Sequence, residues 1–259
     1  MEPIHVHIPY VKLRDFFELV KKRRYHLEIY FPATVLDQLE RDDLEALRER
    51  LDWDPAITIH APFVDLNPGA IDPMVKSVTQ LRFRQILNVA AVLKPRAAVF
   101  HAGYDRWRYN GRKDLWLDNS LDTWRTVIDA ASKIGMPIAV ENVFDEDPEA
   151  LGMLIEKLDT PDFGFCFDTG HFNIFSTVSL ETWFDRLGKR IVEVHVHDNN
   201  GKEDSHWGLG RGTVDFTTFF RLLQKHAHER VPVYTIEAHD KDDIDSSIQQ
   251  AQRLMQSDG

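Results

Sequence analysis

The sequence predicts an α/β fold, a closed parallel (β/α)₈ barrel formed as a single domain by residues 1–259. Eight short apolar or β-branched runs alternate with longer segments whose apolar residues recur about every 3.6 positions. Proline or glycine marks several junctions before a strand, as in Gly135-Met136-Pro137. No linker, low-complexity tract or change of composition marks a second domain, and roughly 250 residues is an ordinary length for one such barrel.

The strands are expected where a short apolar run is bounded by turn residues. In chain order they are 4–8 (IHVHI), 26–31 (HLEIYF), 56–60 (AITIH), 97–101 (AAVFH), 137–142 (PIAVEN), 163–168 (FGFCFD), 191–197 (IVEVHVH) and 233–238 (VYTIEA). Between them, segments such as 81–93 and 121–134 have helical periodicity. The structural alternative is an open, doubly wound sheet, but no G-x-G-x-x-G follows the first strand, where such a sheet usually binds a dinucleotide.

Composition narrows the class of protein. A formal net charge of −11 argues against a broad basic face for nucleic acid. The one cysteine, Cys166, lies in an apolar run and has no intrachain partner, which excludes a disulfide framework and fits a reducing compartment. No secretory signal pattern opens the chain, and no apolar run approaches the roughly 18 residues of a membrane span. We expect a soluble cytoplasmic protein without a membrane partner.

Six consecutive expected strands end in a side chain that binds metals. In order these are His60, His101, Glu141, Asp168, His195 and Glu237. The carboxyl ends of the strands of a closed barrel converge on one face, where the active sites of barrel enzymes lie. A lone strand-end histidine is usually a hydrogen-bonded loop residue, but six in register make coincidence improbable. Imidazole and carboxylate without thiolate suit Zn²⁺, Mn²⁺ or Fe²⁺.

Three further residues extend this set. His171 follows Asp168 by three positions in DTGH, and Asp204 and His206 form a D-x-H in the loop after the seventh strand. Singly each is as readily a capping or turn residue, but together they supply ligands for a separate metal. His197 shares a strand face with His195 and is either a packed polar residue or one that supports the site or contacts the substrate. His5 and His7, on the first strand, are expected at most to support the site from behind its ligands.

One stretch, HAGYDRWRYNGRK (101–113), is both basic and aromatic and follows a strand that ends in a candidate ligand. Arg106 and Arg108 are candidates for binding a phosphate, and Trp107 for covering a sugar or a base. A solvated loop with one ring packed on the barrel rim is the slightly favoured alternative. Arg211, in GLGRG, is another phosphate candidate.

The ordered set HAPF, HAGY, EN, DTGH, HVHDN, D-S-H, GLGRG and IE resembles the xylose isomerase-like TIM barrels, over nearly the whole chain. That superfamily joins sugar and sugar-phosphate isomerases and epimerases to apurinic/apyrimidinic endonucleases of the endonuclease IV type. In the isomerase branch one divalent metal is held at positions matching Glu141, Asp168, His195 and Glu237. The two glutamates there exchange a substrate proton, and His171 contacts a substrate oxygen.

The endonuclease branch has a trinuclear zinc site, and all nine matching positions are filled here. The resemblance implies one metal at His60, His101 and Glu141, a second at Glu141, Asp168, His195 and Glu237, and a third at His171, Asp204 and His206. The chain departs from the family at Arg211, where the motif usually has an acid, and in having a single basic loop able to engage a DNA backbone.

Two functions therefore stand open. The favoured one is a sugar or sugar-phosphate isomerase or epimerase that uses Zn²⁺ or Mn²⁺, with one to three ions per chain across the two branches. The alternative is a zinc phosphodiesterase acting at abasic DNA, which the full ligand set favours and the scarcity of basic loops opposes. Lyases built on the same barrel, and a barrel that binds ligands without turnover, also remain open.

Overall fold

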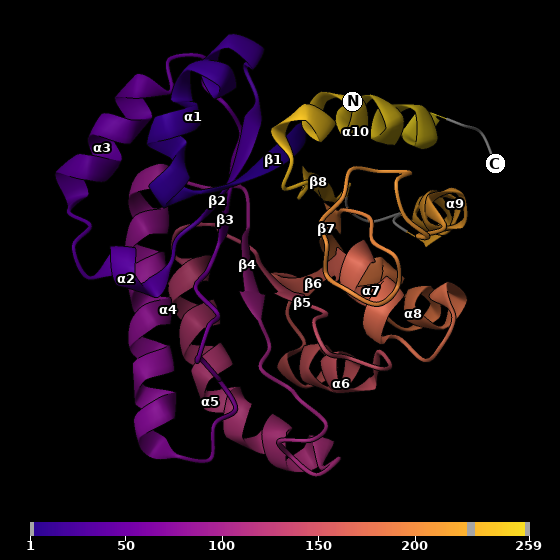
Figure 1. Cartoon of the computed structure of the whole chain (residues 1–259). Helices are drawn as coiled ribbons and strands as arrows, with labels where there is room; N and C mark the ends of the chain where they lie inside the picture. Colours follow the sequence, from indigo (N-terminus) through magenta and orange to yellow (C-terminus); the bar gives the residue numbers. More distant parts are fainter. Residues whose placement is uncertain (1–2, 227–230, 257–259) are drawn as a thin grey trace.

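Eight parallel strands close into a barrel in the computed structural model, which describes residues 3–226 and 231–256 (Figure 1). They pair in sequence order, and β1 pairs with β8, which rules out the open sheet and confirms the (β/α)₈ fold. The strands are β1 (Ile4–Pro9), β2 (His26–Tyr30), β3 (Ile57–His60), β4 (Ala98–His101), β5 (Ile138–Glu141), β6 (Phe163–Asp168), β7 (Ile191–Val196) and β8 (Val233–Ile236). Each expected strand is present, and the bounds differ by at most two residues at either end.

Helices surround the barrel, and each strand is followed by at least one (Figure 1). They are α1 (Tyr10–Arg23), α2 (Ala33–Leu36), α3 (Arg41–Arg50), α4 (Pro73–Leu93), α5 (Lys113–Ser132), α6 (Glu149–Leu158), α7 (Thr169–Phe175), α8 (Leu180–Leu187), the 3₁₀ helix η1 (Gly188–Arg190), α9 (Phe216–His226) and α10 (Lys241–Gln256). Two of them, α4 and α5, begin earlier than the periodic segments 81–93 and 121–134 indicate. Helix α4 starts at Pro73 rather than near residue 81, because Asp72 caps it by accepting a hydrogen bond from the backbone N–H of Met74 at 2.7 Å.

Aromatic side chains fill the space between the strands and the helices. Phe83 on α4 and Trp124 on α5 are buried against Phe100 on β4, with ring centroids 4.8 and 5.9 Å from that of Phe100. On the other side of the barrel, Phe167 on β6 packs on Phe184 and Phe219 at 5.6 and 5.0 Å. This apolar layer anchors the strands, so their carboxyl ends are held at fixed positions.

The alternate residues of the strands point into the barrel and divide its interior into two parts. One part is apolar and small, and consists of Ala97, Val99, Ala139, Cys166 and Val192. The other part is polar and consists of His5, Glu28, Thr58, Glu193 and Thr235, all of them buried. Cys166 is a buried free thiol, as expected from its apolar surroundings. Among the residues that the structure describes, no helix is long and apolar enough to cross a membrane.

Candidate metal centre at the mouth of the barrel

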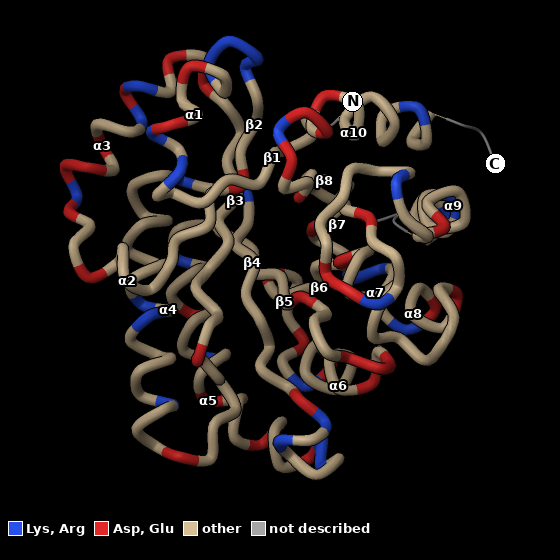
Figure 2. The backbone as a smooth tube through the Cα atoms, viewed as in Figure 1, with Lys and Arg blue, Asp and Glu red and all other residues tan. Residues whose placement is uncertain are grey.

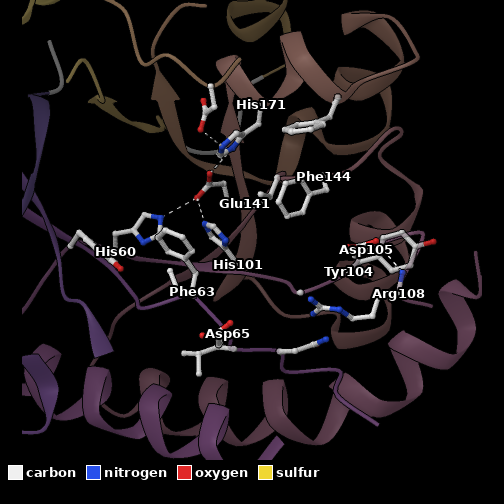
Figure 3. Close-up of a pocket in the computed structure, with 18 of the residues that line it drawn as sticks. His60, Phe63, Asp65, His101, Tyr104, Asp105, Arg108, Glu141, Phe144 and His171 are labelled. Carbon is white, nitrogen blue, oxygen red and sulfur yellow. Dashed lines mark hydrogen bonds and ion pairs between the residues drawn. The ribbon is translucent and has the colours of Figure 1, made fainter. Parts of the chain in front are cut away.

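The six strand-end residues converge at one end of the barrel, around Glu141 at the end of β5. The Glu141 Oε2 atom lies 3.2 Å from Nε2 of His60 and 3.4 Å from Nε2 of His101, while Oε1 lies 2.9 Å from Nδ1 of His171 (Figure 3). Neighbouring strands in register place these side chains together, since His101 pairs with Glu141 and Asp168 with His195. All six are thus brought into one cluster.

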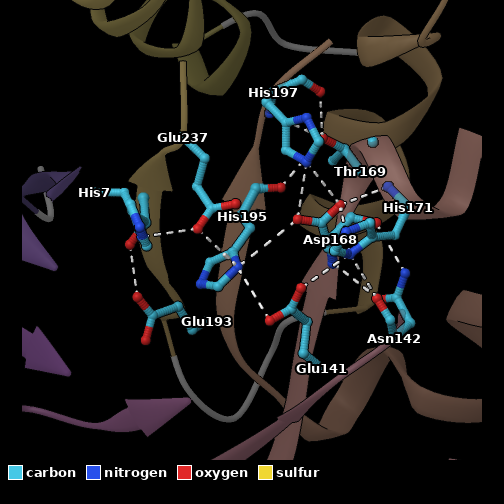
Figure 4. Close-up of polar contacts among 12 residues, drawn as sticks. His7, Glu141, Asn142, Asp168, Thr169, His171, Glu193, His195, His197 and Glu237 are labelled. Atoms are coloured by element: carbon cyan, nitrogen blue, oxygen red, sulfur yellow. Dashed lines mark hydrogen bonds and ion pairs between the residues drawn. The ribbon is translucent and has the colours of Figure 1, made fainter. Parts of the chain in front are cut away.

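Four of these residues form the centre of the cluster. Nδ1 of His195 lies 3.4 Å from Glu237 Oε1, 3.6 Å from Glu141 Oε2 and 3.8 Å from Asp168 Oδ2 (Figure 4). This nitrogen is buried and has no hydrogen-bond partner among the described residues. A buried polar atom without a partner is costly, and three carboxylates that face one imidazole nitrogen are a donor set for a divalent metal. The residues therefore fit the metal that the sequence pattern implies.

Glu28, on β2, supports this centre from behind and was missed by the sequence analysis. Its Oε2 lies 3.1 Å from Nε2 of His195, and its Oε1 lies 2.7 Å from Nδ1 of His7, which is also 3.0 Å from Glu237 Oε1. A carboxylate that accepts the Nε2 proton leaves the lone pair of His195 Nδ1 free for a metal. The inward alternation of HLEIY on β2 was the signal that could have identified Glu28.

The first-strand histidines have different places. His7 lines the cavity and supports Glu237, as the sequence analysis allowed. Burial lowers the pKa of His7, but the carboxylates of Glu237 and Glu28 outweigh this effect and raise it to about 10. His5 lies deeper in the barrel, 3.2 Å from the hydroxyl of Thr58, and does not line the cavity.

A second group of ligand-type side chains surrounds Asp204. Its Oδ2 lies 3.1 Å from Nε2 of His206 and 3.4 Å from Nε2 of His171. His197 is buried against the same group: its ring stacks on His206 with centroids 3.9 Å apart, and its Nε2 lies 3.1 Å from both carboxylate oxygens of Asp168. His197 thus links Asp168 to the Asp204 group rather than packing as an isolated core residue.

Asn142 and Asp168 explain two of the short motifs. In the EN motif, Asn142 exchanges two hydrogen bonds with the backbone of Asp168, at 2.9 and 3.0 Å, which ties the end of β5 to that of β6. In DTGH, the carboxylate of Asp168 accepts the backbone N–H of His171 at 2.6 Å and caps α7. Asp168 therefore has a capping role together with its place in the cluster.

The loop between β7 and α9 carries Asp204 and His206 and is held by Asp198. The carboxylate of Asp198 accepts hydrogen bonds from the backbone N–H groups of Asn199, Gly210, Gly212 and Val214, between 2.8 and 3.1 Å. Residues 198 and 207 also form an antiparallel bridge. Asp198 is buried, and these four hydrogen bonds anchor the whole loop.

The basic residues lie at different distances from the centre. Arg108 lines the cavity next to Tyr104 and Asp105 (Figure 3). Arg106 forms an ion pair with Glu146 at 2.6 Å, and neither it nor the exposed Trp107 lines the cavity. Arg211 forms an ion pair with Asp243 at 2.5 Å and lines a neighbouring hollow of about 590 Å³, which shares His206 and His239 with the main cavity.

The cavity above the centre has a volume of about 910 Å³. Its floor is formed by His7, His60, His101, Glu141, His171, Asp204, His206 and Glu237. The electrostatics of this floor favour carboxylates in the ionised form: although burial opposes charge, the neighbouring histidines hold the pKa values of Glu141 and Glu237 well below their usual range. The cavity thus offers ionised carboxylates next to imidazoles, with room for a small organic substrate.

The chain is similar in sequence to known proteins. The chain is 30% identical over 195 residues to the uncharacterized protein MJ1311 of Methanocaldococcus jannaschii, covering 73% of this chain and 66% of that protein. It is 32% identical over 126 residues to the ketose 3-epimerase of Arthrobacter globiformis, which is 46% of this chain and 41% of the enzyme, so the match spans less than half of that relative.

Solved structures with the same fold cover nearly the whole chain. A D-tagatose 3-epimerase-like protein superposes with a TM-score of 0.82 at 25% identity, covering 97% of each chain. The TTHB071 protein of Thermus thermophilus, soaked with ZnCl₂, superposes with a TM-score of 0.81 at 24% identity, covering 98% of each chain. The family model of the xylose isomerase-like TIM barrel matches residues 15–257. This chain belongs to the xylose isomerase-like TIM barrel family.

Proposed function

We propose that this protein is a divalent-metal-dependent isomerase or epimerase of a small sugar. The observation that carries the proposal is Nδ1 of His195, which is buried without a hydrogen-bond partner among the described residues and faces three carboxylates, two of them those of Glu141 and Glu237. The relatives named as epimerases of sugars support the same class of reaction. Zn²⁺ and Mn²⁺ suit the mixed imidazole and carboxylate ligands, which are Glu141, Asp168, His195 and Glu237.

The chain's own residues supply the proton transfer. When bound, the metal would polarise the carbonyl and the neighbouring hydroxyl of the substrate. Glu141 and Glu237 reach the cavity floor from β5 and from the end of β8, so one takes the proton from the carbon next to the carbonyl and the other returns a proton. The neighbouring histidines hold the pKa values of both glutamates low, so the one that acts as general base is ionised. The other must first take up a proton from solvent before it returns one to the substrate carbon.

His171 completes the set as a hydrogen-bond donor to a substrate oxygen. Burial lowers its pKa, but Asp168, Asp204 and Glu141 raise it well above the usual value for histidine, so the ring is protonated. Phe63, whose ring stacks on His101 with centroids 4.2 Å apart, lines the cavity next to this centre.

The charges around the cavity favour a neutral sugar over a sugar phosphate. Arg108 is the one lysine or arginine among the described lining residues, whereas Asp65, Asp72 and Asp105 also line the cavity. Arg106 is neutralised by Glu146, and Arg211 by Asp243, at separate places. A dianionic phosphate would meet a net negative rim, which Arg108 alone does not offset.

The reaction is tested by incubating the purified protein with a panel of ketohexoses in D₂O, after chelation and after Mn²⁺ or Zn²⁺ is restored. We expect deuterium at the carbon next to the carbonyl of one ketose, together with its epimer or isomer, only with the metal present. Metal-loaded protein that exchanges no C–H in any ketose of the panel, while still binding metal, would contradict the proposal.

A phosphodiesterase is the second candidate, and a specific observation favours it. Two further groups of ligand-type side chains flank the four-residue centre, as a trinuclear site would require. One consists of His60 and His101 beside Glu141, and the other of His206 and His171 beside Asp204. Replacing His206 with alanine separates the two functions: a one-metal isomerase keeps most of its activity, whereas cleavage of an abasic DNA duplex would collapse. The acidic rim opposes binding of a DNA backbone.

A further inference from the structure

The cavity is several times larger than a small sugar needs. A free hexose, packed at the density of about 0.75 found in protein interiors, fills roughly 200 Å³, whereas the cavity has a volume of about 910 Å³. A sugar whose reacting carbon lies next to Glu141 and Glu237 would therefore leave most of the cavity empty. The remaining space lies towards the loops that follow β3, β4 and β5, beyond the floor residues of the candidate centre.

The walls of that remaining space are largely apolar. Six apolar residues line it from the segment between β3 and the first turn of α4, namely Phe63, Val64, Leu66, Ala70, Ile71 and Val75, together with Asp65, Asn67 and Asp72. The loop after β4 adds Gly103, Tyr104, Asp105, Arg108 and Tyr109. Three more come from the segment after β5 and from α7, namely Val143, Phe144 and Phe175. The rings of Phe144 and Phe175 meet edge to face with centroids 5.2 Å apart, and Phe175 lies 6.4 Å from the ring of His171. The apolar wall thus continues directly from a residue of the candidate centre.

Several of these side chains are exposed to solvent to an unusual degree. Val64, Ile71 and Phe144 have 61%, 62% and 56% of their surface accessible. Exposed apolar side chains scattered singly need no explanation, but a group of them lining one cavity marks a place where apolar surface is covered by a ligand. Figure 3 shows Phe63 beside His101 and Phe144 beside Glu141, with Asp105 and Arg108 farther from Glu141.

We propose that the substrate of this site is a sugar that carries an aryl or short alkyl group at the end remote from the reacting carbon, and that Phe144, Phe175, Val64 and Ile71 bind this group. The inference rests on the proposed function, because it takes the sugar to be held at Glu141 and Glu237. The neutral, apolar character of the group follows from the wall that it would cover and from the net negative rim, which disfavours a phosphate.

The test compares D-fructose, 6-O-methyl-D-fructose and 6-O-benzyl-D-fructose as ligands of the Mn²⁺-loaded protein by isothermal titration calorimetry. We expect the benzyl ether to bind at least ~10-fold more tightly than the methyl ether, since each fully buried methylene group is worth about fourfold in affinity. The substitutions Phe144→Ala and Ile71→Ala, each at an exposed residue, should reduce this ratio several-fold. Ile134→Ala, at an exposed residue that does not line the cavity, is the matched control and should leave the ratio unchanged.

The outcomes separate the two proposals. Equal binding of the three ketoses, or a benzyl preference that survives both substitutions, overturns the apolar subsite and leaves the proposed function standing. No binding of any ketose contradicts the proposed function and this inference with it. A dimer in solution that Ile71→Asp dissociates also overturns the inference, because the apolar rim would then be covered by a second copy of the chain.

Discussion

At the scale of single residues, the candidate centre depends on the orientation of one imidazole. His195 presents Nδ1 to the carboxylates of the centre and Nε2 to Glu28, so the carboxylate behind the ring decides which nitrogen is free for a metal. Glu28 itself is fully buried, and although burial raises its pKa, contact with His195 and His7 lowers it to about 2. An ionised carboxylate in this position also favours a proton on the Nε2 side of His195.

Replacing Glu28 with glutamine removes that charge while keeping the shape of the side chain. We expect the affinity for Mn²⁺ or Zn²⁺ to fall about 10- to 100-fold, which is typical for a partner of a metal-binding histidine. A loss of stability should accompany it, because the buried charge of Glu28 is paired with His195 and His7 in the folded protein. Metal titration of the apoprotein measures the effect.

Glu193→Gln is the matched control for Glu28. Glu193 is equally buried in the barrel, and burial together with the charge of Glu28 raises its pKa to about 8, so this side chain is already neutral at pH 7. Its Oε1 accepts hydrogen bonds from Thr58 and Thr235, which glutamine preserves. Equal losses of metal affinity in the two variants would contradict a specific role for Glu28.

Asp145 gives the stability a predictable dependence on pH. Burial raises its pKa to about 7, from 3.8 in the unfolded chain. Because the folded-state pKa is the higher one, the favourable contribution of the neutral carboxyl is complete below pH 3.8 and is lost as the pH rises through 7. The side chain of the Asp145→Asn variant stays neutral at every pH. The free energy of unfolding of this variant minus that of wild type should therefore rise by about 2–3 kcal/mol between pH 5 and pH 8.

Urea denaturation of both proteins at several pH values measures this gain. The exposed Asp159 offers the control Asp159→Asn, which should show no such trend. A difference between Asp145→Asn and wild type that is constant with pH would contradict the account.

At the scale of elements, the strand ends could be predicted from sequence and the supporting contacts could not. Turn residues and apolar runs locate a strand end to within two residues, which was enough to identify His60, His101 and Glu141 as neighbours. Glu28 was missed because it lies in the middle of β2 rather than at its end. The start of α4 was predicted too late in the chain, because its first two turns show little apolar periodicity and the helix begins at its capping residue, Asp72.

The loop between β7 and α9 offers the sharpest test at this scale. Asp198→Ala leaves four backbone N–H groups without their buried acceptor, and we expect a loss of about 3 kcal/mol in the free energy of unfolding. Faster proteolysis within residues 199–213 should accompany it, because Asp198 holds this loop.

The matched substitution is Glu203→Ala, at an exposed position of the same loop, which should change neither quantity. If Asp198→Ala were as stable and as resistant to protease as wild type, the loop would be held by other contacts.

At the scale of the whole molecule, the packing between strands and helices supports the barrel, and the candidate centre lies at the carboxyl ends of the strands. Aromatic packing between strands and helices fixes the strand ends, and acids and bases are interspersed over the surrounding helices without forming one basic face in this view (Figure 2). The basic cluster 21–24 lies at the end of α1 that precedes β2, away from the carboxyl ends of the strands, with Lys21 and Arg23 paired to Asp52 and Asp245. Barrel closure follows from the sequence pattern, but the size and apolar character of the cavity depend on how its loops fold.

The most direct test of the central claim is the metal content of the purified, unchelated protein, measured per chain by elemental mass spectrometry in wild type and in Glu141→Gln. We expect about one Mn²⁺ or Zn²⁺ per chain in wild type, and a large loss in Glu141→Gln, because that carboxylate faces His195 directly. About three zinc ions per chain would favour the phosphodiesterase instead. A wild-type protein that binds no metal even after incubation with each ion, or a Glu141→Gln variant with unchanged occupancy, would contradict the account.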